Sequence, residues 1–561
     1  MILKIKFNIQ EGILISHFTH QSWGYVLILL IAVFLLSCSL PDKDRIRADI
    51  CILSGSEAGF TAAIQAARMG KEVVLIEPTG HPGGMMAEGI AKDIRFGSAR
   101  VIGGITREIY TAIEEHYGRV PDFDEPNWFS RYEPHVAEKI IEEYLSREKT
   151  IRIIRNTRIR EKGGVKRTGN KIQAITLENG IEIQARVFVD ASVEGDLIHF
   201  AGIHTESIRE GNARYGETKN GNRVENTYRQ FEVRVDPYKI PGDPSSGLIH
   251  TVQYGELGTE GVPSRFIQGY CYRLVLTRDP VNRMFIEQPP DYNPLDYEIY
   301  RRYIRAGGAL FYPQATRPNG KTDLGSWHDL SANLYGENWE YPEGDYATRE
   351  RILKYHEEFT RGLIWFLQHD TAVDETTRAN WEGWGLCRDE FTDNGGWPRR
   401  LYIRSARRMV SDYVITEHHT RRDNPERIED PVAIAWWPPD THHARRIVRD
   451  GVAYNEGFVF GGDDWRPFGI SWQALVPDPA QCINLISPTC PSSSYVAYGA
   501  IRILPTFMIL GQSAGCMAVM ALEAGIPVQE LNYTELRTKL IEAGQILEVP
   551  DNWLEIITSE N

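Results

Sequence analysis

The stretch from Asp49 to Met86 constrains the fold more than any other part of the chain. After Asp49 come four apolar residues, a turn of small residues, an alanine-rich segment and a second apolar run that ends in Glu77. Residue type and spacing predict a strand, a tight turn, a helix and a second strand, over residues 50–53, 54–59, 60–69 and 72–76. This order, closed by an acid, predicts a dinucleotide-binding βαβ unit.

The turn of this unit is expected to hold the phosphates of a dinucleotide. In such units the pyrophosphate lies on the helix N-terminus, and the acid accepts a hydrogen bond from a ribose hydroxyl. The usual pattern has glycine at three positions, but serines stand at the first two and only Gly59 fits. An ordinary βαβ packing unit is the alternative. The expected nucleotide contacts are Ser54, Gly55, Ser56, Ala58, Gly59 and Glu77.

A pair of glycines follows the acid, in Gly83-Gly84-Met85. Adjacent glycines let the backbone approach a ligand closely. Flavoproteins of the glutathione-reductase type use such a segment against the flavin end of their cofactor. The three residues are therefore expected to contact the cofactor, and they favour FAD over NAD.

Two later segments are predicted to complete the site. The first is a strand-to-turn segment that would place three residues beside the nucleotide, namely Asp190, Gly195 and Asp196. The second is a helix over residues 506–524, which we expect to begin through Gly511, Gln512, Ser513 and Ala514. A helix start there would aim backbone N–H donors at the flavin O2, which is negatively charged in reduced flavin. A helix-packing face of small residues is the alternative.

The N-terminus carries a predicted export signal. Residues 25–36 form an apolar run that is too short to span a membrane and is typical of a signal-peptide core. The following Leu35-Leu36-Ser37-Cys38 resembles a bacterial lipobox, with Cys38 as the lipidated first residue of the mature protein. An ordinary cleaved signal or a simple membrane anchor is the alternative. We expect a cell-envelope lipoprotein, anchored at the periplasmic side, the outer membrane or the cell surface.

Charge and cysteine spacing disfavour several classes of partner. The net charge of −14 argues against nucleic acid, because phosphate-backbone binding needs a basic face. The six cysteines other than Cys38 include no C-x-x-C pair, so neither zinc nor an iron–sulfur cluster is expected. We therefore predict no metal site.

Composition divides the rest of the chain. The middle region is rich in aromatic, proline and turn residues and contains no second dinucleotide turn, which predicts an inserted α+β substrate or cap domain. The chain then becomes regular again, with a helix expected over residues 402–416. The predicted divisions are a signal peptide (1–38), a tether (39–46), an FAD-binding domain in two parts (47–215 and 397–545), the cap (216–396) and a tail (546–561).

Several segments together resemble a known family. The chain is similar to bacterial FAD-dependent oxidoreductases related to the flavin domain of the heterodisulfide reductase A subunit. The resemblance implies an α/β fold, with a Rossmann-like, three-layer FAD-binding domain of the glutathione-reductase-2 type built on a parallel sheet. It does not extend to the iron–sulfur cysteines of the larger heterodisulfide enzymes, which are missing. The matching segments span residues 49–525 and include SGSEAGFTAAIQAARMGKEVVLIEPTGHPGGM, FVDASVEGDLIHFAG, DEFTDNGGWPRRLYIRSARRM and DTHHARR.

Hydride transfer to a flavin also needs a base for the substrate's hydroxyl or amine proton. The candidates are His442 and His443, and because adjacent side chains point in different directions at most one is expected to reach the flavin. Arg273 and Arg404 are candidates to clamp a carboxylate or to steady reduced flavin. Structural roles are the alternative for all four. A tryptophan group suggests a sugar-stacking platform, although such residues more often lie in a core: Trp397, Trp436, Trp437 and Trp472.

Three hypotheses follow from these observations. The first is an exported FAD-dependent oxidoreductase that transfers a hydride between FAD and a small organic substrate, for which a carbohydrate-derived compound is one candidate, with an unknown electron acceptor. The second is a flavoprotein that catalyses an elimination or isomerisation without net redox change. The third is a non-enzymatic glycan-binding protein on a flavin fold.

Overall fold

The computed structural model describes residues 45–558 except 92–93, 126–127, 226–227 and 327–328. The predicted signal sequence, Cys38 and most of the tether lie outside the described residues. The short strand β1 (Arg45–Arg47) begins the described part. Residues from Arg47 onward form one compact unit.

A five-stranded parallel sheet organises the nucleotide-binding part, with the order β20-β8-β2-β3-β4. Strand β2 pairs with β3 on one side and with β8 on the other, so the strand order reverses at β2. In open α/β sheets, ligands bind outside the carboxyl ends of the strands at such a reversal. The sheet confirms the predicted α/β fold. Its strands are β2 (Ile50–Leu53), β3 (Val73–Glu77), β4 (Ile151–Arg155), β8 (Val187–Asp190) and β20 (Leu485–Ile486).

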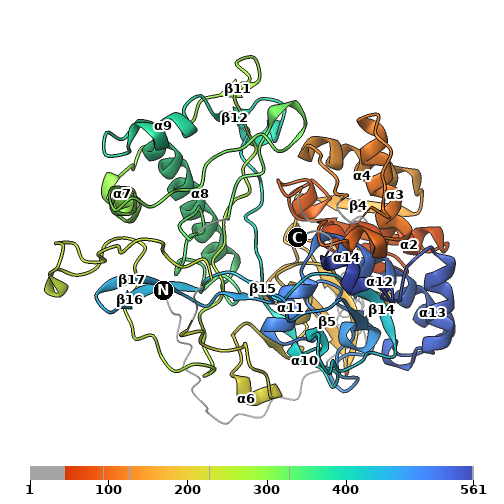
Figure 1. The fold of residues 1–561 in the computed structure, drawn as a ribbon. Helices are drawn as coiled ribbons and strands as arrows, with labels where there is room; N and C mark the ends of the chain where they lie inside the picture. Colours follow the sequence, from red (N-terminus) through yellow and green to blue (C-terminus); the bar gives the residue numbers. More distant parts are fainter. Residues whose placement is uncertain (1–44, 92–93, 126–127, 226–227, 327–328, 559–561) are drawn as a thin grey trace, which may run out of the picture. The chain divides into compact units, whose positions relative to one another are not determined.

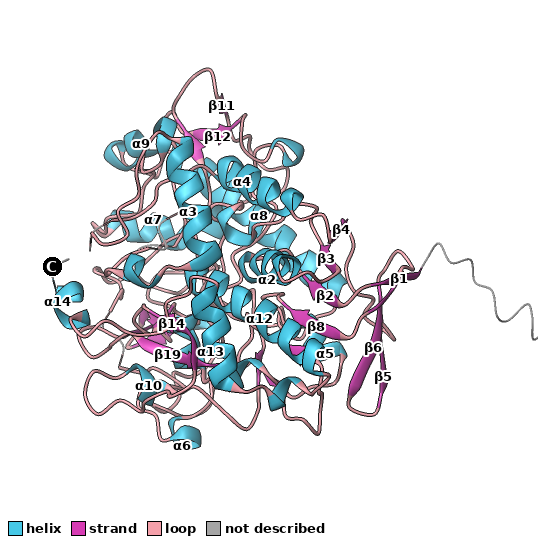
Figure 2. Ribbon diagram, turned by 90° about the vertical axis from the view of Figure 1, so that its right-hand side faces the viewer, coloured by secondary structure: helices cyan, strands magenta, loops and turns pink. Residues whose placement is uncertain are grey.

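Helices α2 (Glu57–Arg68) and α12 (Leu504–Ala524) pack against each other beside this sheet (Figure 2). A Cβ atom at Gly511 would lie 2.1 Å from the carbonyl oxygen of Ala58, so glycine is needed for the close contact. By length and composition α12 could cross a membrane, but 83% of its most apolar window is buried in the protein. It is the core helix of this unit.

The predicted helix start at Gly511 is wrong. Helix α12 begins two turns earlier, at Leu504, and Pro505 stands in its first turn, where a proline costs no helical hydrogen bond. Residues 511–514 therefore lie inside the helix, where Gly511 serves helix packing, as the alternative interpretation expected.

The helix predicted over residues 402–416 is also wrong. This segment is extended, with Tyr402 bonded to Cys271 through its backbone and a short strand, β13 (Arg408–Met409), paired with β9 (Thr205–Glu206). Polar and aliphatic side chains alternate from Arg400 to Arg404, a period of two that is typical of extended chain.

The middle region builds a second hydrophobic cluster of its own. Helix α8 (Tyr346–His369) gathers with α7 (Glu298–Arg305), α9 (Glu375–Trp381) and a small antiparallel sheet (Figure 1). The domain boundaries given above stay predictions. The sheet consists of β10 (Leu276–Thr277), β12 (Gly385–Cys387) and β11 (Arg283–Met284).

Several of the remaining elements contribute to the main hydrophobic core of the chain. The further strands are β5 (Val165–Thr168), β6 (Lys171–Thr176), β7 (Glu182–Gln184), β14 (Pro431–Ala435), β15 (Asp440–Thr441), β16 (Arg445–Arg449), β17 (Val452–Glu456), β18 (Val459–Phe460) and β19 (Phe468–Ser471). The further α-helices are α3 (Gly104–His116), α4 (Pro134–Arg147), α5 (Asp196–Phe200), α6 (Asn212–Tyr215), α10 (Glu417–Thr420), α11 (Tyr495–Ile501), α13 (Tyr533–Glu542) and α14 (Trp553–Thr558). The 3-10 helices are η2 (Gly84–Met86), η3 (Ser98–Val101), η4 (Pro244–Ser246), η5 (Pro294–Tyr297), η6 (Pro318–Gly320), η7 (Thr392–Asn394), η8 (Trp472–Leu475) and η9 (Val528–Glu530).

Candidate cofactor and substrate site

The turn after β2 has the backbone of a glycine-rich dinucleotide turn although serine stands at its first position. Ser54 has a φ of 74°, a left-handed conformation that glycine adopts without strain. Ser56 caps α2: its Oγ accepts a bond from the N–H of Gly59 at 3.3 Å and donates to the carbonyl of Ala191 at 2.6 Å. A Cβ atom at Gly59 would lie 1.8 Å from the carbonyl oxygen of Ser54, so helix and strand can approach this closely only with glycine there.

Glu77, the acid after β3, holds this turn in place. Its buried carboxylate accepts bonds from the N–H of Gly55 at 2.9 Å, from the N–H and the hydroxyl of Thr79 at 2.8 Å each, and from Arg400. The carboxylate stabilises the turn from behind and does not line the cavity in front of it. Its predicted contact with a ribose stays a prediction.

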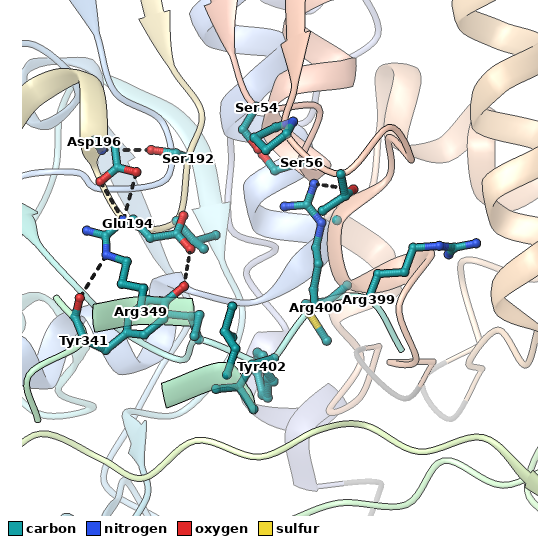
Figure 3. A pocket seen from close by; sticks show the side chains of 18 of the residues that line it. Ser54, Ser56, Ser192, Glu194, Asp196, Tyr341, Arg349, Arg399, Arg400 and Tyr402 are labelled. Carbon is teal, nitrogen blue, oxygen red and sulfur yellow. Dashed lines mark hydrogen bonds and ion pairs between the residues drawn. The ribbon is translucent and has the colours of Figure 1, made fainter. Parts of the chain in front are cut away.

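A first cavity of about 270 Å³ opens at the carboxyl ends of β2, β3 and β8 (Figure 3). Five of the predicted cofactor-binding residues line it: Ser54, Ser56, Gly84, Met85 and Asp196. The other predicted cofactor-binding residues do not line it: Gly55, Ala58, Gly59, Glu77, Gly83, Asp190, Gly195, Gly511, Gln512, Ser513 and Ala514.

Some of these residues hold in place the backbone of elements that contribute to the cavity wall. Asp190 accepts bonds from the N–H of Ser192 at 3.0 Å and the N–H of Ile198 at 2.9 Å, and burial raises its pKa to about 6. Gln512 accepts a bond from the N–H of Ile105 at 2.9 Å, which ties α12 to α3. These residues act on the cavity through the elements that they position.

Arginines dominate the first cavity, and only Arg404 among them was a predicted site residue. Arg349 binds Asp196, with its Nη1 atom 2.9 Å from both carboxylate oxygens, and Arg400 reaches towards the serine turn (Figure 3). The buried Nε atoms of Arg400, Arg404 and Arg502 have no partner among the described residues. A buried N–H without an acceptor is costly, so these three groups are ready donors for an anion. The cavity-lining arginines are Arg158, Arg349, Arg399, Arg400, Arg404 and Arg502.

The alternation of side chains from Arg400 to Arg404 was the signal that could have identified part of this group. In extended chain, residues two apart share a face. All six residues from Arg399 to Arg404 line the first cavity, so the extended chain itself forms this part of the wall and its polar side chains supply the donors. The incorrect helix prediction concealed this pattern.

The N-terminus of α12 lies where this cavity meets a second one. Leu504, the first residue of the helix, lines both cavities, as do Tyr402 and Arg502. The positive end of the helix dipole therefore faces the junction.

The second cavity has a volume of about 640 Å³ and contains two of the four predicted catalytic residues, Arg273 and His442. Arg404 lines the first cavity, whereas His443 lines neither and is packed with its ring centroid 4.9 Å from that of Phe458. Burial, reinforced by nearby arginines, lowers the pKa of His442 well below its ordinary value. His442 is therefore neutral at pH 7.

Polar groups hold the arginines of the second cavity. Arg273 pairs with Asp323 and lies 3.3 Å from the hydroxyl of Ser326. Arg502 donates to the hydroxyl of Tyr402 at 2.6 Å and to the carbonyl of Asp440 at 2.8 Å. Of the tryptophans considered as a sugar platform, only Trp437 lines this cavity; the others are buried in the core, namely Trp397, Trp436 and Trp472.

A cluster with metal-ligand chemistry lies apart from both cavities. Oxygen and nitrogen atoms of Glu133, His135 and Glu390 lie within 4.8 Å of one another. The ammonium of Lys321 lies 2.6 Å from Glu133 and 2.7 Å from Glu390, so a protein cation already fills this group. Its residues form a buried ion-pair network.

The residues around the two cavities fit FAD. The capped N-terminus of α2 and the unpaired N–H groups of Arg400 and Arg404 provide donors for a pyrophosphate. The N-terminus of α12 and Arg502 provide positive charge for the electron-rich end of a flavin. Two adjacent cavities that share lining residues suit a long cofactor with a separate substrate space.

Comparison with known proteins agrees with this arrangement. The family described as "FAD dependent oxidoreductase" matches residues 49–540, and no curated protein matches the chain. Partial similarity is found to P. aeruginosa PqsL in complex with 2-aminobenzoylacetate, with 18% identity, coverage of 29% of this chain and 47% of PqsL, and a TM-score of 0.23. The match thus spans about half the length of PqsL.

Two further solved structures are similar in part. Thermovibrio ammonificans THI4 shows 17% identity, 35% and 76% coverage of this chain and of THI4, and a TM-score of 0.22. L-proline dehydrogenase from P. horikoshii shows 20% identity, 30% and 25% coverage, and a TM-score of 0.17. The match over residues 49–540 establishes FAD as the cofactor and oxidation–reduction as the type of reaction. The chain belongs to the FAD-dependent oxidoreductase family.

Proposed function

We propose that this oxidoreductase transfers a hydride between FAD held in the first cavity and a small organic substrate held in the second. The junction carries this proposal, because Tyr402, Arg502 and Leu504 line both cavities. FAD, when bound, supplies the group that accepts or donates the hydride. The chain itself supplies binding, orientation and proton transfer.

The turn and the arginines would hold the cofactor. Ser54 and Ser56 leave room beside the N-terminus of α2, and Arg400 and Arg404 approach from the extended segment on the other side. Arg502 and the first turn of α12 place positive charge at the junction. These groups favour the negative charge that a flavin carries when reduced.

His442 would hold the proton that accompanies hydride transfer. Its ring lines the second cavity and its Nδ1 atom lies 3.4 Å from the side-chain nitrogen of Asn333. Because the imidazole is neutral at pH 7, it can accept a proton from a substrate hydroxyl or amine. The surrounding arginines disfavour a lasting imidazolium, which promotes release of the proton.

A His442→Gln variant should keep its flavin. The rate at which a substrate reduces that flavin, seen as bleaching of its visible absorbance, should fall about 10²- to 10⁴-fold. The measurement is anaerobic stopped-flow absorbance with a panel of sugars, hydroxy acids and amines. A histidine with so low a pKa acts as a base above that pKa, so no acid limb should occur near pH 6.5. An unchanged bleaching rate in His442→Gln would show that His442 does not accept the substrate proton. Turnover without any electron acceptor would instead favour an isomerisation or elimination.

A carbohydrate-derived substrate is the specific form that we propose. Trp437, Phe311 and Tyr312 line the second cavity and offer aromatic faces for a sugar ring. An exported protein would meet such compounds outside the cytoplasm. The panel used for bleaching tests this point, because it contains sugars beside acids and amines.

Export and lipid anchoring rest on the lipobox-like Leu35-Leu36-Ser37-Cys38. The full-length protein should partition into the membrane fraction and incorporate a labelled fatty acid, whereas Cys38→Ser should lose the label. Fractionation and metabolic labelling measure both. Retention of the label by Cys38→Ser would contradict anchoring through this cysteine.

A further inference from the structure

We propose that the substrate of the second cavity carries a carboxylate, held by Arg502 and Arg273. This inference rests on the proposed function, since it concerns the ligand of the same cavity. It follows from how the arginines of that cavity are paired.

Arg502 is a buried cation with neutral partners. Its side chain is 4% exposed and donates to the hydroxyl of Tyr402 and to the carbonyl of Asp440. The carboxylate of Asp440 is 4.0 Å away, at the limit of an ion pair, and the Nε atom of Arg502 has no partner among the described residues. Burying an incompletely paired charge is costly, and an anion in the cavity would offset that cost.

Arg273 presents a second open donor to the same cavity. Its Nη atoms bind Asp323 and the hydroxyl of Ser326, but its buried Nε has no partner among the described residues. Asp323 is shared, because Arg317 also lies 3.8 Å from it. One carboxylate therefore serves two buried guanidinium groups, and neither is fully neutralised.

The charge of the cavity wall matches a single negative charge. Arg95, Arg273 and Arg502 line it against Asp323 and Asp440, which leaves one positive charge. Arg95 is exposed and has no acidic partner in the described part of the chain. With oxidised, uncharged flavin at the junction, a carboxylate restores neutrality, whereas an ammonium group would add repulsion and a neutral sugar would leave the charge of the wall uncompensated.

Two neutral polar residues of the wall offer contacts for the rest of such a molecule. The hydroxyl of Thr316 is buried without a partner in the described structure, and Gln314 lies on the same wall. These neutral polar groups suit substrate hydroxyls rather than further charge. The wall thus combines a charged end with a neutral polar region.

The test is titration calorimetry on the flavin-loaded protein with acetate, glycolate and gluconate, each beside a neutral counterpart, namely ethanol, ethylene glycol and sorbitol. We expect at least one carboxylate to bind and its counterpart to bind about 10- to 100-fold more weakly. Arg273→Gln and Arg502→Gln should each weaken carboxylate binding by a similar factor. Arg537→Gln, at an exposed site on α13, is the matched control and should change nothing.

Each outcome separates this inference from the proposed function. If no carboxylate binds to a protein that is fully loaded with flavin and reduced by a neutral substrate, the inference fails and the proposed function stands. If carboxylates bind but no substrate ever reduces the flavin, the proposed function fails. Equal binding of sulfate would identify a general anion site and contradict a carboxylate site. Should Arg502→Gln not fold, Arg273→Gln decides the question.

Discussion

At the scale of single residues, the dinucleotide turn shows that a motif is a set of backbone conformations before it is a set of letters. Ser54 adopts the left-handed conformation for which glycine is usual, and Ser56 uses its side chain to cap the helix. The two serines are therefore not equivalent substitutions. One strains the turn, whereas the other stabilises it.

The change Ser54→Gly should raise the free energy of unfolding by about 1 kcal/mol, because glycine removes the cost of a left-handed L-residue. The Ser54 side chain makes no hydrogen bond in the described structure. The matched change Ser56→Gly should lower the free energy of unfolding by about 1–2 kcal/mol, since the carbonyl of Ala191 loses a buried donor. Urea denaturation measures both, and a destabilised Ser54→Gly would show that its φ carries no strain.

At the scale of elements, the contact between α2 and α12 determines which part of α12 lies at the cavities. Close packing fixes Gly511 in the middle of α12 and leaves the helix N-terminus at the junction of the two cavities. Two opposing effects act at Gly511. Alanine has a helix propensity better by about 1 kcal/mol, but its Cβ would meet the carbonyl of Ala58 at 2.1 Å.

The clash should outweigh propensity, so Gly511→Ala should destabilise the protein by about 1–3 kcal/mol. The control is Glu523→Ala, at an exposed position near the end of the same helix. Chemical denaturation followed by circular dichroism gives both values. A Gly511→Ala protein more stable than wild type would mean that propensity wins and that the helices are not in close contact.

The sequence predicted the elements whose signals are local. The βαβ order at residues 50–77 was identified, because strand, turn and helix preferences act over a few residues. The arginine-lined wall was not identified. Its members come from Arg158 after β4, from α8, from the extended segment 399–404 and from Arg502, and only tertiary folding brings these together.

At the scale of the whole molecule, the strand reversal at β2 places one ligand site on the nucleotide-binding part and a second beside it. The first cavity draws its walls from the central sheet and from α8, and the second is lined largely by the middle region. Cofactor and substrate would thus meet at a junction formed by Tyr402, Arg502 and Leu504. This arrangement of cofactor and substrate requires FAD to occupy the first cavity.

Flavin stoichiometry tests that claim most directly. Val193 lines the first cavity, so Val193→Trp should fill it, whereas Val281 is 82% exposed and Val281→Trp is the matched control. Flavin released on denaturation is measured by its visible absorbance, after circular dichroism has verified folding. We predict one FAD per chain in the wild type and in Val281→Trp, and loss of most of the flavin in Val193→Trp. Full flavin in a folded Val193→Trp, or none in the wild type, would contradict the account.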